Sequence, residues 1–236
     1  MMQINVTFDL NQSSLPAGFI AAVTYAVNYL DQVFTNPVTI NIDVGYGEIG
    51  PPPYTPLPSN ALGESYAPNY VNESYSSVRS ALLAQPAPGA STLPSSSPLQ
   101  GGLWMASAEA KALGLYSASS AIDGYVGFSS SANFDYATNP SSVPANQYYF
   151  VGVAEHEITE DMGRVSLLDQ QPYYYAPIDL FRYSANGARD LTTGGSGSTA
   201  YFSTDNGATN LGNWNNDINN GDLADWYPSG PAPGGA

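Results

Sequence analysis

The chain of 236 residues contains no cysteine. This absence excludes disulfide bonds, thiolate nucleophiles and metal sites built from thiolates. Basic residues are scarce: five lysines and arginines stand against 20 aspartates and glutamates, and the formal net charge is -15. Because phosphate groups are bound by clustered lysines and arginines, we expect no nucleic-acid partner. The same shortage excludes a polybasic contact with a membrane surface.

A long apolar run is also missing. The candidate membrane stretch, residues 15–30, is uncharged but contains Pro16 and Asn28. It is short for a membrane-spanning helix, so we expect no membrane segment. The first residues lack the basic and apolar regions of a signal peptide. The chain is rich in serine, threonine, asparagine, glycine and tyrosine without cysteine, a composition similar to that of secreted bacterial proteins. We therefore expect an extracellular protein whose export signal lies outside this sequence.

The apolar content is sufficient for a folded protein. Hydrophobic residues make up 43% of the chain, which is enough to build a core despite the high net charge. At this length one domain is the default. We expect a monomer in which residues 1–236 form a single domain, with an N-terminal lobe over residues 1–163 and a C-terminal lobe over residues 164–236. The composition shifts near Gly163 toward short strands and turns.

Hydrophobic periodicity predicts an α+β fold. Residues 3–10 and 38–44 alternate as strands do, and apolar residues between them recur at helical spacing from Phe19 to Val33, so these segments form a βαβ unit. Ser13 and Ser14 are the expected helix caps. Further helices are expected over residues 70–83, 106–115 and 145–162, strands over 124–129, 178–183 and 199–203, and a long loop over 85–102. The expected architecture is a twisted mixed sheet with long helices, followed by a small irregular β-rich lobe.

The chemistry-bearing motif surrounds His156, which is the one histidine of the chain. On a helix, His156 and Glu160 lie one turn apart and project from the same face. Two ligands at this spacing can hold a metal ion, and Glu157 then points toward a metal-bound water, as in the H-E-x-x-H motif of zinc hydrolases. Here the motif reads H-E-x-x-E. The alternative is a solvated polar helix face without a metal.

The residues after this motif favour the metal site. Gly163 lies where a metal-binding helix must end to return a third ligand, and glycine suits the left-handed conformation that ends helices. Ser166 and Asp169 follow.

At this point the sequence resembles metzincin-like secreted bacterial metalloproteases. Relatives of that family read H-E-x-x-H-x-L-G-F-x-S-x-x-D, followed downstream by D-L-F-R-Y. The matching positions here are His156, Glu157, Gly163, Ser166 and Asp169, followed by the segment 179–183. These specific motifs cover only about residues 149 to 184.

The resemblance implies a zincin-type fold with an active-site helix beneath a cleft. It implies a catalytic zinc ion held by His156, Glu160 and Asp169, with Glu157 as the general base. Three features depart from the family. Glu160 replaces the second histidine, Ser166 stands where a metzincin has its third histidine, and no methionine follows Asp169. Two carboxylate ligands would cancel the charge of a divalent ion, which favours a slower enzyme or a harder metal such as manganese or calcium.

Two other regions carry candidate binding residues. Tyr174 and Tyr175 are expected to form a substrate-binding wall, or else to pack as aromatic side chains. The run of asparagines and aspartates over residues 213–226 offers the oxygen ligands that a structural calcium ion uses, although a solvated polar loop explains it equally well.

The sequence therefore predicts a secreted zinc-dependent endopeptidase that acts on peptide or protein substrates. Two alternatives remain open. One is a pseudo-protease or binding module of the same fold that lost its activity with the second histidine. The other is a β-rich adhesin or carbohydrate-binding protein whose tyrosines and tryptophans form the contact surface.

Overall fold

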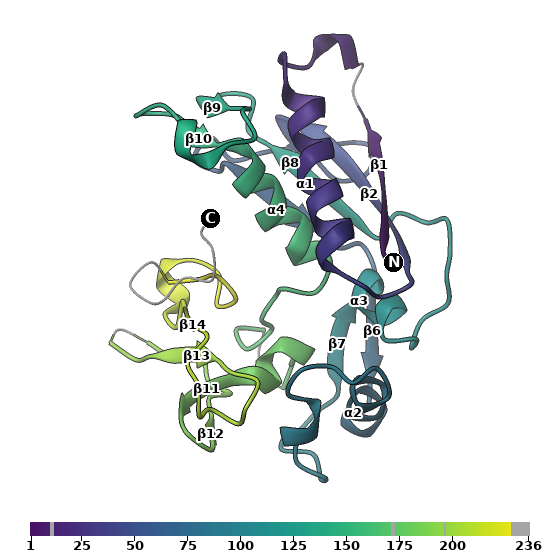
Figure 1. Ribbon diagram of the computed structural model, residues 1–236, viewed down its shortest axis with the longest axis vertical. Helices are drawn as coiled ribbons and strands as arrows, with labels where there is room; N and C mark the ends of the chain where they lie inside the picture. Colours follow the sequence, from purple (N-terminus) through teal and green to yellow (C-terminus); the bar gives the residue numbers. More distant parts are fainter. Residues whose placement is uncertain (10–11, 171–172, 196, 228–236) are drawn as a thin grey trace.

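A computed structural model describes residues 1–9, 12–170, 173–195 and 197–227 of the chain. Within these ranges it contains four α-helices and several small sheets, so the expectation of an α+β fold is confirmed. No helix in the described ranges has the length and apolar character needed to cross a membrane. Figure 1 shows α1 (Phe19–Val33) and α4 (Phe150–Asp161) beside the mixed sheet in the upper half, with α2 (Tyr75–Ala84), α3 (Ser107–Ala112) and the C-terminal strands below them.

The mixed sheet has the strand order β1-β2-β8-β5. The strands β1 (Gln3–Phe8), β2 (Thr39–Tyr46) and β8 (Gly124–Phe128) are parallel, whereas the edge strand β5 (Gly63–Tyr66) runs antiparallel to β8. Helix α1 (Phe19–Val33) connects β1 to β2. The predicted βαβ unit is confirmed, because alternating and helical apolar patterns are local properties of the sequence.

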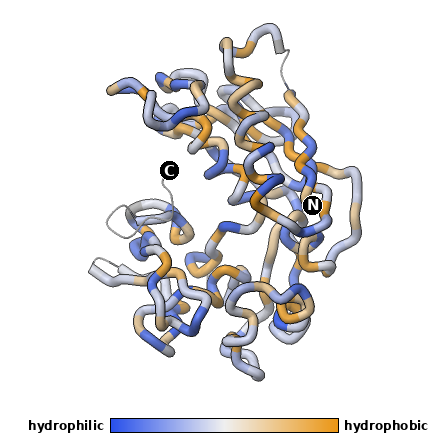
Figure 2. The backbone as a smooth tube through the Cα atoms, viewed as in Figure 1, coloured by the Kyte–Doolittle hydropathy of each residue, from blue (hydrophilic) through white to orange (hydrophobic). Residues whose placement is uncertain are grey.

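Helix α1 packs beside α4 (Phe150–Asp161) on one face of this sheet (Figure 1). Apolar and polar residues alternate around α1 (Figure 2), and its buried residues include Phe19, Val23, Ala26 and Leu30. Val33, the last position of the predicted apolar stripe, is 52% exposed. Gly18 caps the helix instead of Ser13 or Ser14, which form a separate 3-10 turn (Gln12–Ser14). The ring of Phe150 lies 5.0 Å from that of Phe19 and ties the two helices together.

A second core lies below the sheet. It packs α2 (Tyr75–Ala84), β7 (Leu103–Ala106) and α3 (Ser107–Ala112) against Leu180 and Phe181, so it contains residues from both sides of Gly163. The helix predicted over residues 70–83 is too long. Its first residues form β6 (Tyr70–Glu73), because they pair with β7 in an antiparallel ladder.

The C-terminal region forms the sheet β12-β11-β13-β14. Its strands are β11 (Arg182–Ala185), β12 (Ala188–Arg189), β13 (Ala200–Phe202) and β14 (Gly212–Trp214). The strand predicted over 178–183 is wrong in its first half, where Pro177–Phe181 forms a 3-10 helix and Asp179 accepts a hydrogen bond from the Ala176 amide. Four further two-residue strands form two small sheets: β3 (Glu48–Ile49) with β4 (Thr55–Pro56), and β9 (Phe134–Asp135) with β10 (Tyr148–Tyr149).

Helix α4 begins later than predicted, because Tyr148 and Tyr149 pair with β9. Its end follows the prediction. Gly163 has a φ of 116°, and its amide donates to the Glu160 carbonyl. A side chain at this position would be strained, and its Cβ would lie 2.7 Å from the carboxyl carbon of Glu109. Glycine therefore both ends the helix and makes room for a buried acid.

Candidate metal centre

Three side chains that can ligate a metal converge at α4. The Nε2 atom of His156 lies 3.1 Å from Glu160 Oε1 and 3.2 Å from Asp225 Oδ1. One ligand atom from each of the three residues lies within 4.8 Å of the others. His156 and Glu160 share a helix face, as their spacing predicts, and Asp225 comes from the C-terminal segment.

Stacked tryptophans position Asp225. The rings of Trp214 and Trp226 lie 4.2 Å apart with an interplanar angle of 9°, and the two residues also form an isolated antiparallel bridge. The amide of Asn215 donates to the backbone carbonyl of Asp225 at 2.7 Å. Aromatic stacking and backbone pairing therefore hold the segment that contains Asp225 in a fixed position beside helix α4.

Asp169, the third ligand implied by the family resemblance, is not part of this group. It lines the same cavity, and its Oδ2 accepts a hydrogen bond from the Gln170 side chain at 3.2 Å. The nearby Ser166 hydroxyl donates to Asp179 Oδ1 at 2.6 Å, which fixes the loop after α4 to the 3-10 helix. Asp225 thus holds the third place in the cluster, and a metal-binding role of Asp169 stays a prediction.

The guanidinium group of Arg164 connects the cluster to its surroundings. Arginine has five N–H bonds in a rigid planar fork, and here all five have an acceptor. Two go to the carboxylates of the cluster, Glu160 Oε1 and Asp225 Oδ1, both at 3.2 Å. The other three go to the Ala224 carbonyl at 2.9 Å, the His156 carbonyl at 3.0 Å and the Thr159 hydroxyl at 3.0 Å. One cation therefore orients two carboxylates and the end of the helix.

Glu157 lies on the sheet side of the cluster, beside strand β5. The side chain is mostly buried, and a Cβ added to Gly63 would lie 2.7 Å from both its Cγ and its Oε1. Glycine at this edge strand therefore makes room for the Glu157 carboxyl. Ser65, two residues on, donates to Glu160 Oε2 at 2.7 Å. The front cavity, as we call the space lined by β5, α4 and residues 164–170 and 222–225, has a volume of about 660 Å³.

The charged side chains at this site shift one another's pKa values. Burial lowers the pKa of His156, but hydrogen bonds to Asp225 and Glu160 outweigh burial and raise that pKa to about 9. Burial and the charge of Glu160 raise the pKa of Glu157 to about 8. For Asp225, burial acts upward, whereas the hydrogen bond and charge of His156, together with Arg164, bring its pKa below the usual value. Without a metal, His156 is therefore an imidazolium held between two carboxylates.

Asp161 is the acid that the cluster does not reach. Both its carboxylate oxygens are buried and have no hydrogen-bond partner among the described residues. Burial first, and then the charges of Glu160 and Glu157, raise its pKa well above the usual value. It packs against Gly124 in β8, where a side chain would collide with it. Asp161 is accordingly a buried acid with a raised pKa, packed between α4 and β8 at the wall of the front cavity.

Tyr174, Tyr175 and the asparagines of the amide-rich run lie outside this cluster. Tyr174 stacks on Trp104 at 5.5 Å, and the carbonyl of Tyr175 accepts a hydrogen bond from the Trp104 amide at 2.7 Å. Neither tyrosine lines the front cavity, so a substrate-binding role for them stays a prediction. In the run over residues 213–226, Asn216 Oδ1 accepts from Arg182, and Asn215 donates to the Asp222 carbonyl. Binding of structural calcium there also stays a prediction.

Sequence reasoning missed two members of this site. Asp225 belongs to the run that was considered for calcium, and its proximity to His156 depends on tertiary contacts that no spacing rule encodes. Arg164 directly follows the helix-ending Gly163. Its charge is the feature that could have indicated a role: Arg164 is one of only five basic residues, and it follows a helix that carries four acids.

Comparison of the chain with protein-family models, with curated proteins and with solved structures finds no match.

Proposed function

We propose that the protein is a secreted, zinc-dependent endopeptidase whose metal ion is held by His156, Glu160 and Asp225. The convergence of these three side chains carries the proposal. Ligand atoms 2.0–2.2 Å from a tetrahedral zinc ion lie about 3.4 Å apart. The two nitrogen–oxygen separations in the cluster, 3.1 and 3.2 Å, are close to that spacing. The chemistry of the donors, one imidazole and two carboxylates, also fits zinc.

The residues around this centre support hydrolysis. A divalent ion bound there would polarise a peptide carbonyl and lower the pKa of a water molecule. Glu157 would accept the proton from the attacking water and pass it to the leaving amine. Its pKa of about 8 lies near neutral pH, where a group can both take and give a proton. Its burial against Gly63 keeps the carboxyl at the edge of the front cavity.

Arg164 supports the proposal by balancing charge. Two carboxylate ligands would neutralise a divalent ion and weaken its effect on water. The guanidinium donates to both of those carboxylates. It therefore draws electron density from them and returns one positive charge to the site, which makes an H-E-x-x-E centre compatible with catalysis.

The surrounding fold fits a peptide substrate. Strand β5 is the edge of the mixed sheet and lines the front cavity. An extended peptide can pair with such an edge strand through backbone hydrogen bonds. A mixed sheet with an antiparallel edge strand beside the motif helix also supports the resemblance to metzincin-like proteases. The net charge of -15 favours neutral or basic peptides.

A pseudo-protease of the same fold is the second candidate. One observation favours it: an imidazolium at His156, with its pKa of about 9, satisfies both carboxylates without any metal. Such a cluster would be a structural ion-pair network. The two candidates differ in metal binding and in peptide cleavage.

Metal analysis combined with a cleavage assay tests the proposal. The purified protein should contain about one equivalent of zinc and should cleave a mixed peptide library. A chelator should abolish cleavage, and added zinc should restore it. Zinc binding without cleavage would favour the pseudo-protease, and absence of both would overturn the metal centre.

A further inference from the structure

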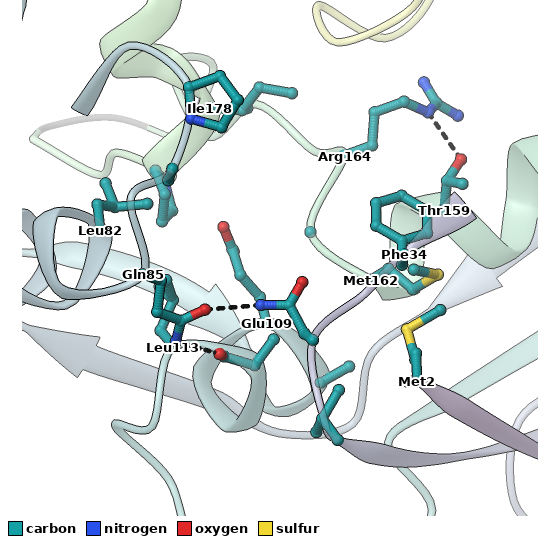
Figure 3. A pocket seen from close by; sticks show the side chains of 18 of the residues that line it. Met2, Phe34, Leu82, Gln85, Glu109, Leu113, Thr159, Met162, Arg164 and Ile178 are labelled. Carbon is teal, nitrogen blue, oxygen red and sulfur yellow. Dashed lines mark hydrogen bonds between the residues drawn. The ribbon is translucent and has the colours of Figure 1, made fainter. Parts of the chain in front are cut away.

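A second and larger cavity lies on the other side of Arg164. We call it the rear cavity. It has a volume of about 850 Å³ and is lined by residues from Met2 to Trp226; Figure 3 shows part of this lining. It lies where the end of α4 meets α3, the end of α2 and the C-terminal region. His156, Glu160 and Asp225 do not line it, so it is distinct from the candidate metal centre.

The walls of the rear cavity are mainly apolar. They include Phe34, Leu82, Leu113, Met162, Ile178 and Trp226. Among the polar groups, the side chains of Asn36 and Gln85 are bonded to each other at 2.6 Å, and Gln85 also donates to the Ala112 carbonyl at 2.5 Å (Figure 3). These two amides therefore already have hydrogen-bond partners within the protein.

Glu109 differs from these amides in its hydrogen bonding. It lines the cavity from α3 (Figure 3), and its Oε2 atom is buried without a hydrogen-bond partner among the described residues. The carboxyl packs against Gly163, where an added Cβ would lie 2.7 Å from it. A buried polar atom without a partner costs free energy. Glu109 is also the one acid among the lining residues, so its carboxyl is the group to which a charged ligand in the cavity would donate.

The charges around Glu109 select the kind of donor. Burial and then the charge of Asp179 raise the pKa of Glu109 well above its usual value. The one cation among the lining residues is Arg164, and all its N–H bonds are committed elsewhere. No cation beside Glu109 therefore stabilises its ionised form, and a positively charged donor, which would supply that stabilisation, fits better than a neutral one.

We propose that the rear cavity binds a small molecule with an apolar body and a primary ammonium group. The ammonium pairs with the Glu109 carboxylate, and the apolar body packs against the aromatic and aliphatic walls. The volume lies within the 300–1,000 Å³ typical of small-molecule sites. A charge-assisted hydrogen bond in such an apolar site is stronger than a neutral one. This inference is independent of the proposed peptidase activity.

Calorimetric titration at neutral pH with two matched probes tests the inference. The probes are 4-phenylbutylamine and 4-phenyl-1-butanol, which share an apolar body and differ in the head group. The amine should bind at least about tenfold more tightly than the alcohol, because a hydrogen bond to a charged group contributes about 1.5–3 kcal/mol. In Glu109→Gln the two probes should bind equally. Glu73→Gln, a carboxyl outside the cavity, should retain the preference.

A second variant keeps the proposal testable if the Glu109→Gln protein does not fold. Ile178→Trp should fill part of the cavity and weaken both probes. Trp214 and Trp226 line the cavity, so the amine should also change tryptophan fluorescence in the parent protein. Equal binding of amine and alcohol to the parent, failure of both to bind at millimolar concentration, or an unchanged preference in Glu109→Gln would overturn the proposal.

Discussion

The two cavities on either side of Arg164 differ in how their acids are paired. In the front cavity, Glu160 and Asp225 each bond to both His156 and Arg164. In the rear cavity, Glu109 has a buried oxygen without a partner. The difference shows that this chain has too few lysines and arginines to pair with every buried acid. Asp225, which Arg164 reaches, has a lowered pKa, whereas Glu109, which Arg164 does not reach, has a raised pKa.

The use of the other basic residues sharpens this comparison. Lys111 forms a buried ion pair with Asp123 at 2.7 Å. Arg79 and Arg189 donate to backbone carbonyls, and Arg182 donates to a carbonyl and to an asparagine. Among the described lysines and arginines, only Lys111 and Arg164 therefore form ion pairs with acids. Of the five lysines and arginines, Arg164 is the one that lines both cavities.

Glu157→Gln should have the largest effect on the front cavity. Gln keeps the shape but cannot accept a proton, so peptide cleavage should fall by about 10²–10⁴-fold. Zinc content should stay the same, because Glu157 is not in the ligand group. The measurement is kcat on a peptide together with zinc content. The control is Glu73→Gln, and cleavage at the parental rate would remove Glu157 from the mechanism.

Gly63→Ala should disturb the same carboxyl without changing it chemically. The added Cβ would lie 2.7 Å from Glu157 Cγ and Oε1, so the carboxyl must move. A displacement of about 1 Å at a catalytic group can cost up to about 100-fold in rate. Gly195→Ala is the matched control, since no atom lies within 4 Å of its added Cβ. Equal kcat values in both variants would show that Glu157 is not positioned by β5.

Much of the fold follows from local pattern, whereas the site follows only in part. The βαβ unit and the end of α4 at Gly163 are predicted correctly, because alternation, helical spacing and a positive φ are properties of a few consecutive residues. The helix over residues 70–83 fails at its start because Tyr70 and its neighbours pair with β7, a tertiary preference that overrides helix spacing.

The candidate site shows the same limit. His156 and Glu160 are brought together by one helical turn, so their spacing predicts their contact. Asp225 reaches them through stacking of Trp214 on Trp226, which leaves no periodic signal. Helical spacing can therefore predict two members of such a cluster, but the third depends on how the C-terminal region folds back.

Arg164→Lys tests whether the arginine orients the carboxylates. Lysine has three donors on a flexible stem and cannot reproduce the five hydrogen bonds. Zinc affinity should fall by about 10–100-fold, the range seen when a partner of a metal ligand is removed. Arg79→Lys is the control, because Arg79 binds the Leu93 carbonyl away from the cluster. In Arg164→Ala, added guanidinium should restore part of the affinity; unchanged affinity in both variants would show that Arg164 is only structural.

The smallest expected effect concerns pH and the stability of the metal-free protein. His156 and Glu157 have folded-state pKa values of about 9 and 8, above their ordinary values of 6.5 and 4.5. A raised pKa stabilises the fold below the unfolded-state value, and this stabilisation is lost as the pH rises through the folded-state value. Chelated protein should therefore lose about 1–3 kcal/mol between pH 6.5 and 9. Urea unfolding across this range measures it, and His156→Asn should show a weaker dependence; a rise in stability with pH would contradict the assignment.

Zinc titration of three chelated proteins tests the central claim most directly. The parent should bind one equivalent, and Asp225→Ala should lose at least about 100-fold in affinity, since zinc sites use three or four protein ligands. Asp169→Ala should bind like the parent, because Asp169 lies outside the converging group. If Asp169→Ala loses zinc while Asp225→Ala retains it, or if the parent binds none, the metal centre described here is wrong.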